Sequence, residues 1–106
     1  MLTIGAEGDF WIEDGVLRAY FGNGGEVTIP DGVTEIGALA FKNCTTLTKL
    51  TFPDSVTVIG KEAFRECTSL SGITLPTSLE TIGDYAFFQC SGMTGDLVIP
   101  DSVITI

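Results

Sequence analysis

Hydrophobic and small residues recur along the chain at a nearly constant step of 23 residues. The four prolines, Pro30, Pro53, Pro76 and Pro100, are separated by 23, 23 and 24 residues. Four further columns keep the 23-residue step: Gly37, Gly60 and Gly83; Ala40, Ala63 and Ala86; Phe41, Phe64 and Phe87; Cys44, Cys67 and Cys90. Aliphatic columns are Val33, Val56, Leu79 and Val103; Ile36, Ile59, Ile82 and Ile106; Leu47, Leu70 and Met93. Agreement of so many columns at one period predicts a stack of equivalent structural units.

Each unit begins with a short extended segment. The alternation of apolar and polar residues predicts a strand that buries Leu50 and Phe52 and exposes Lys49 and Thr51. Pro53 follows at once and ends the strand, because proline has no N–H to donate to a neighbouring strand.

A tight turn, a second strand and a helix are expected after the proline. Pro53 fits the second position of a type I turn, and residues 56–59 form the second extended segment. Gly60 ends this segment, either through a positive φ or through a close approach of another backbone. Residues 61–67 are predicted to form about two helical turns whose inward side chains share i, i+3 and i, i+4 spacing: Ala63, Phe64 and Cys67.

Stacking is required because a unit of this size cannot bury a core alone. The units are 29–51, 52–74, 75–98 and a partial 99–106, the 24-residue step arising from one extra residue near Gly95. The predicted fold is α+β but dominated by strands. Since the last unit stops at Ile106, we expect a fragment of a longer array, with an uncapped C-terminal end through which copies of the chain could self-associate.

Residues 1–28 differ from the units and are predicted to form an N-terminal capping segment. Asp14 and Gly15 stand between two apolar, strand-prone runs, which indicates a β-hairpin with a two-residue turn. Trp11 and Tyr20 are expected to lie on the first unit.

The phrases at residues 29–44 and 52–67 resemble the BspA-like leucine-rich repeats of surface proteins from gut and oral bacteria and some parasitic protists. The resemblance covers about residues 16–106. It implies a right-handed solenoid, export to the cell surface or secretion, and a role in adhesion or protein binding, with a host or extracellular-matrix protein as a candidate partner. No signal peptide is visible, so the localisation rests on the resemblance.

Composition narrows the chemistry. With 14 acidic and 5 basic side chains, the net charge of −9 repels nucleic acid and anionic membranes. No apolar run is long enough to insert into a membrane. The chain has no histidine, so neither a Ser-His-Asp triad nor the usual zinc site can be built. We therefore predict no enzyme, no cofactor and no metal site.

The cysteine column allows two interpretations. Residues one strand spacing apart, about 5 Å, could form a disulfide. Alternatively, Cys44, Cys67 and Cys90 form a ladder of buried thiols that bond backbone groups, which the odd number favours because any internal pair leaves one cysteine over.

The candidate partner-binding surface is the outward face of the first strand of each unit. Its residues are Glu26, Thr28, Lys49, Thr51, Gly72, Thr74, Asp96 and Val98. The face has no aromatic anchor, so a hot spot for tight binding is not evident. Two functions follow: an interaction or adhesion module that binds through this face, and a structural spacer that presents other domains without a ligand of its own.

Overall fold

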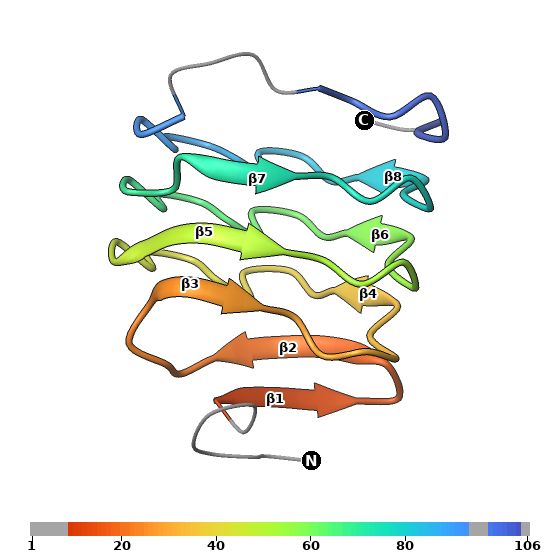
Figure 1. Ribbon diagram of the computed structural model, residues 1–106, viewed down its shortest axis with the longest axis horizontal. Coiled ribbons are helices and arrows are strands. Elements are labelled where there is room, and N and C mark those ends of the chain that lie inside the picture. Colours follow the sequence, from red (N-terminus) through yellow and green to blue (C-terminus); the bar gives the residue numbers. More distant parts are fainter. Residues whose placement is uncertain (1–8, 94–97, 105–106) are drawn as a thin grey trace.

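In a computed structural model, which describes residues 9–93 and 98–104, the chain folds into two sheets of short strands (Figure 1). The strands are β1 (Phe10–Glu13), β2 (Val16–Tyr20), β3 (Gly25–Thr28), β4 (Glu35–Ile36), β5 (Leu47–Thr51), β6 (Val58–Ile59), β7 (Gly72–Thr74) and β8 (Thr81–Ile82). One sheet has the order β1-β2-β4-β6-β8 and the other β3-β5-β7. The pairs between units are parallel, so equivalent strands stack as the repeat predicts. The predicted strand-dominated repeat fold is confirmed.

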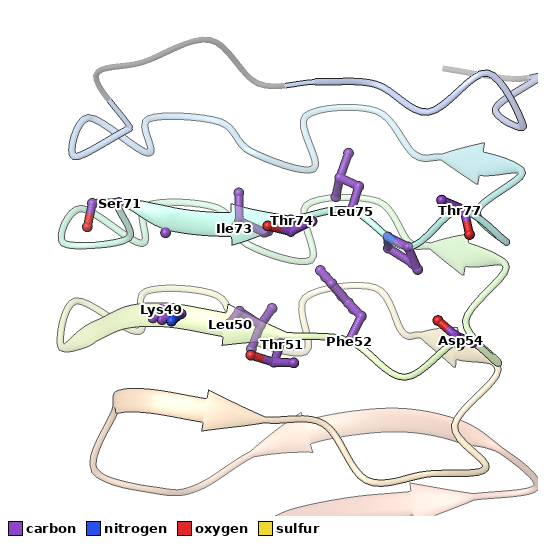
Figure 2. Close-up of a pocket in the computed structure, with 12 residues that line it drawn as sticks. Lys49, Leu50, Thr51, Phe52, Asp54, Ser71, Ile73, Thr74, Leu75 and Thr77 are labelled. Carbon is purple, nitrogen blue, oxygen red and sulfur yellow. The ribbon is translucent and has the colours of Figure 1, made fainter.

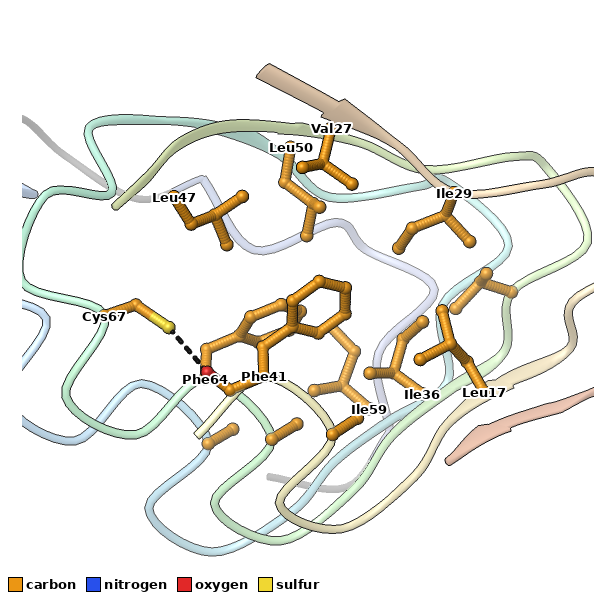
Figure 3. Close-up of a cluster of buried hydrophobic side chains, with 14 of the residues drawn as sticks. Leu17, Val27, Ile29, Ile36, Phe41, Leu47, Leu50, Ile59, Phe64 and Cys67 are labelled. Carbon is orange, nitrogen blue, oxygen red and sulfur yellow. Dashed lines mark hydrogen bonds between the residues drawn. The ribbon is translucent and has the colours of Figure 1, made fainter. Parts of the chain in front are cut away.

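The core consists of equivalent side chains stacked in columns between the two sheets (Figure 3). Leu50 pairs with Val27 and Ile73, and Ile59 pairs with Ile36 and Ile82, each one strand away. Leu50 and Ile59 are buried. The 23-residue period therefore places equivalent apolar side chains next to each other, and each unit covers the apolar surface of the next.

An aromatic column runs through this core. Phe64 stacks on Phe41 with ring centroids 5.1 Å apart and on Phe87 at 5.4 Å. The column continues through Tyr20, 5.1 Å from Phe41, to Phe10, 5.4 Å from Tyr20. Phe41 and Phe64 are fully buried, so the prediction that the phenylalanine column lies inside is confirmed.

The predicted helix in each unit is wrong. Residues 38–43, 61–66 and 84–89, which we call the turn side, form successive turns and no helix. The backbone has positive φ at Leu39 and Asn43, and at the equivalent positions in the other two units. The Phe41 N–H donates to the Ala63 carbonyl of the next unit at 2.8 Å, whereas a helix would keep that bond within its own segment.

Close backbone approach explains the glycine column. A Cβ on Gly60 would lie 2.7 Å from the Ala38 nitrogen, and one on Gly83 would lie 2.6 Å from the Lys61 nitrogen. Neither glycine has a positive φ. Of the two alternatives for Gly60, the structure therefore selects crowding against the preceding unit.

The proline turn is offset by one residue from its predicted register. The Val56 N–H donates to the Pro53 carbonyl at 3.4 Å, so Pro53 occupies the first position of the turn and not the second. Proline suits this position because it contributes a carbonyl and no N–H. Within the turn, the Ser55 hydroxyl donates to the Val33 carbonyl of the preceding unit at 2.7 Å, and this side-chain bond links the turns of the two units.

The N-terminal hairpin is present. Asp14 and Gly15 have φ values of 50° and 80°, as a type I′ turn requires at both central positions. Tyr20 packs on the first unit as predicted, whereas Trp11 is 40% exposed. Strand β2 pairs in parallel with β4, so the hairpin is continuous with the sheet of the array.

Candidate functional site

The outward face of the β3-β5-β7 sheet carries two columns of polar positions. Lys49 pairs with Glu26 on one side and with Gly72 on the other. Thr51 pairs with Thr28 on one side and with Thr74 on the other. Apart from the half-buried Gly72, these residues are exposed. The parallel register thus brings six of the eight predicted site residues together on one face.

The last two predicted residues are not placed in this array. Val98 is 77% exposed and is not part of one of the described strands. It borders a hollow of about 330 Å³ whose wall includes Ile73 and Leu75. Asp96 lies outside the residues that the structure describes.

A groove of about 500 Å³ crosses β5 and β7 on this face (Figure 2). Its polar lining comes from Lys49, Thr51 and Thr74, and also from Asp54 and Thr77 in the turns beyond the strands. The sequence analysis missed the last two, although both occupy turns that follow Phe52-Pro53 and Leu75-Pro76. The groove therefore offers an ammonium group, a carboxylate and several hydroxyls to a partner.

Gly72 leaves room for the side chain of Lys49 on the neighbouring strand. A Cβ on Gly72 would lie 3.3 Å from Cγ of Lys49, so the aliphatic part of the lysine lies over the glycine. Lys49 makes no ion pair within the described residues. Its ammonium group is consequently available to a carboxylate of a partner.

Metal-binding clusters and membrane-spanning helices are both absent from the part of the chain that the structure describes. It contains no cluster of three histidine, cysteine, aspartate or glutamate residues that could bind a metal ion. It also contains no helix with the length and hydropathy needed to cross a bilayer.

Two of the three cysteine thiols donate hydrogen bonds to backbone carbonyls of the preceding unit. The Cys67 thiol donates to the Phe41 carbonyl at 3.1 Å (Figure 3), and the Cys90 thiol donates to the Phe64 carbonyl at 2.9 Å. All three cysteines are free, but Cys67 is buried whereas Cys44 and Cys90 are half-buried, so the buried-thiol interpretation is confirmed in full for Cys67 alone. Burial raises the pKa of Cys44 and Cys90, and that of the fully buried Cys67 to about 12, with the neighbouring Cys90 adding to the effect.

The Cys67 thiol should make the protein less stable at alkaline pH. The unfolded chain releases this proton near the ordinary thiol pKa of 9.0, whereas the folded chain retains it up to about 12. The free energy of unfolding should therefore fall as pH rises above 9, by about 1.4 kcal/mol per unit. Urea unfolding at about pH 7.5 and 10.5 should show a drop roughly 2 kcal/mol larger in the natural chain than in Cys67→Ala. An equal drop in both proteins would contradict this assignment.

Comparison with known proteins agrees with the architecture. The sequence matches the BspA type leucine rich repeat region over residues 19–106, in six copies. No curated protein matches it. A T. pallidum leucine-rich repeat protein of known crystal structure is 38% identical, with a TM-score of 0.78 over 83% of this chain and 43% of that one.

Two further crystal structures are similar. A leucine-rich cell surface protein from Faecalibacterium prausnitzii A2-165 is 29% identical, with a TM-score of 0.72 over 83% of this chain and 24% of that one. A leucine-rich repeat protein from Bacteroides ovatus ATCC 8483 is 42% identical, with a TM-score of 0.66 over 76% of this chain and 21% of that one. The chain thus spans less than half the length of each of these proteins.

Proposed function

Because the chain belongs to the BspA-type leucine-rich repeat family, we propose that it is a protein-interaction and adhesion module of a bacterial cell-surface or secreted protein. It winds as a right-handed solenoid, the hand that parallel strand connections adopt. It binds a host or extracellular-matrix protein through the outward face of β3, β5 and β7. The family is generally non-enzymatic, and the proposed function is recognition without catalysis.

The groove across the parallel strands β5 and β7, with the polar side chains that line it, is the observation that carries this proposal. Thr28, Thr51 and Thr74 repeat at strand spacing, so a partner that lies along the array meets a hydroxyl on each successive strand and the ammonium group of Lys49 on one of them. Each contact on such a face is weak, since the face has no large aromatic anchor. Affinity then grows with the number of units that engage at once.

Two substitutions on this face test the proposal. Thr51→Arg places a long cation in the groove, and Lys49→Glu reverses its unpaired charge. With solubilised extracellular-matrix protein on a biosensor surface as the probe, we expect saturable binding of the natural chain. Each substitution should weaken it about tenfold or more. Thr68→Arg, an exposed threonine outside the strands, is the matched control and should leave binding unchanged.

The spacer function makes the opposite prediction. A spacer presents other domains and has no partner of its own, so the natural chain should show no saturable binding to the matrix preparation or to host-surface protein. Loss of binding in Thr68→Arg as severe as in Thr51→Arg would also count against the strand face as the binding site.

A further inference from the structure

Large apolar side chains project from the turn side at positions where neither solvent nor the backbone favours them. Tyr85 is 65% exposed with φ of 56°, and Leu39 is 47% exposed with φ of 63°. The left-handed backbone region favours glycine and asparagine, and an exposed position favours a polar side chain. These two residues satisfy neither preference.

A groove lies beside Tyr85. It encloses about 370 Å³ and is lined by Lys61, Glu62, Arg65, Tyr85 and Phe88. The Phe88 ring is 39% exposed and meets Tyr85 edge-on at 5.6 Å. The patch therefore joins a protruding ring to a hollow of a size that could receive a ring.

Contacts of the Arg65 side chain fix the shape of this groove. Its Nη1 lies 2.7 Å from Oε1 of Glu62, and its Nε lies 3.3 Å from Oε2 of Glu66. The guanidinium carbon stands 5.4 Å from the centroid of the Phe88 ring. These three contacts hold the floor of the groove in place before anything binds.

The distribution of charge over the chain favours a second copy of the same chain as the partner of the turn side. The turn side has three basic residues (Lys42, Lys61, Arg65) and three acidic ones (Glu62, Glu66, Asp84), so its net charge is zero. The rest of the chain has 2 basic and 11 acidic residues, which accounts for the whole charge of −9. Two copies of the chain therefore repel each other least when their turn sides meet.

Two unpaired charges make the turn side complementary to itself. Lys61 and Asp84 occupy equivalent positions in adjacent units, and neither forms an ion pair within the described residues. A two-fold axis that passes between them places Lys61 of each copy against Asp84 of the other.

We propose that the turn side is the interface of a two-fold symmetric homodimer, in which Tyr85 of each copy enters the groove of the other. The patch spans only three units, which predicts a weak dimer with a dissociation constant of about 10–100 µM.

Sedimentation velocity over about 5–500 µM chain tests this proposal directly. We expect the weight-average mass to rise from that of a monomer towards twice that value. Tyr85→Asn should remain monomeric at all concentrations while staying folded, because asparagine tolerates the left-handed backbone. Circular dichroism and urea unfolding confirm the folded state of this variant.

A charge exchange separates the specific pair from general stickiness. Lys61→Asp alone should weaken the dimer about tenfold, because it faces Asp84 of the second copy. Adding Asp84→Lys, which restores opposite charges across the axis, should recover the natural dissociation constant within about threefold. Failure of this rescue would overturn the proposed axis.

The C-terminal end is the competing surface for self-association. Ile104 there is 81% exposed, and Ile104→Asp should leave the dimer intact. Loss of the mass increase in Ile104→Asp would transfer self-association to that end and overturn the proposal. A natural chain that stays monomeric at the highest concentration would also overturn it and would leave a different protein as the occupant of the groove.

Discussion

Phe64→Ala is expected to lower the free energy of unfolding by about 3–5 kcal/mol, the range observed when a fully buried phenylalanine is truncated. Phe64 has no exposed surface and stacks on Phe41 and Phe87, 5.1 and 5.4 Å away. Phe52 meets it edge-on at 6.2 Å. The neighbouring rings are held by their own units and cannot close the cavity, so both contact area and ring stacking are lost.

Phe87→Ala is the matched comparison for this substitution. Phe87 is half-buried and stacks on Phe64 alone among the aromatic residues in the described chain. Its removal should cost about 2 kcal/mol, because less surface returns to water and one ring contact is lost. Urea unfolding followed by circular dichroism measures both values. Equal losses in the two variants would show that the column does not act as a continuous stack.

Gly60→Ala should destabilise the chain by about 3 kcal/mol, although it adds a single methyl group. The added Cβ would lie 2.7 Å from the Ala38 nitrogen, 2.9 Å from the Gly37 carbon and 2.9 Å from the Ile36 oxygen. All three are backbone atoms of the preceding unit and cannot rotate away. Relief requires the two units to separate, which lengthens the Gly60 N–H to Ile36 carbonyl bond of 2.7 Å.

Gly25→Ala distinguishes crowding from backbone preference. Gly25 has φ of +74°, and a Cβ added there would have no neighbouring atom within 4 Å, so alanine meets conformational strain but no clash. The expected cost is about 1 kcal/mol. Both variants are compared by their urea midpoints at constant m-value. A cost for Gly25→Ala that equals or exceeds that of Gly60→Ala would contradict the explanation of the glycine column.

The periodic sequence was sufficient to predict which residues stack. A buried Leu50 and an exposed Lys49 and Thr51 follow from alternation within one strand, and the 23-residue step then carries the pattern into neighbouring strands. The polar columns of the strand face are predictable for the same reason. Parallel strands in register need no information beyond the repeat length.

The helix was mispredicted because two structures share the same spacing. Ala63, Phe64 and Cys67 fit one face of a helix, yet successive turns also bury all three. The choice depends on hydrogen bonds such as that from Phe64 N–H to the Ala86 carbonyl at 2.8 Å, whose partner is contributed by the next unit. Periodicity within one unit contains no information about such a bond, and the groove on the turn side was missed for the same reason.

Hydrogen bonds join each turn of the chain to its neighbours at three places: the two sheets and the turn side. An extra residue inside any one of these segments would shift it out of phase while the other two stayed aligned. Length is therefore expected to change mostly at the corners, although the pairing of β3 with β5 does contain a one-residue register shift between Gly25 and Glu26. Evolution of such an array is expected to proceed by duplication or deletion of whole 23-residue blocks, which keeps every bond in phase.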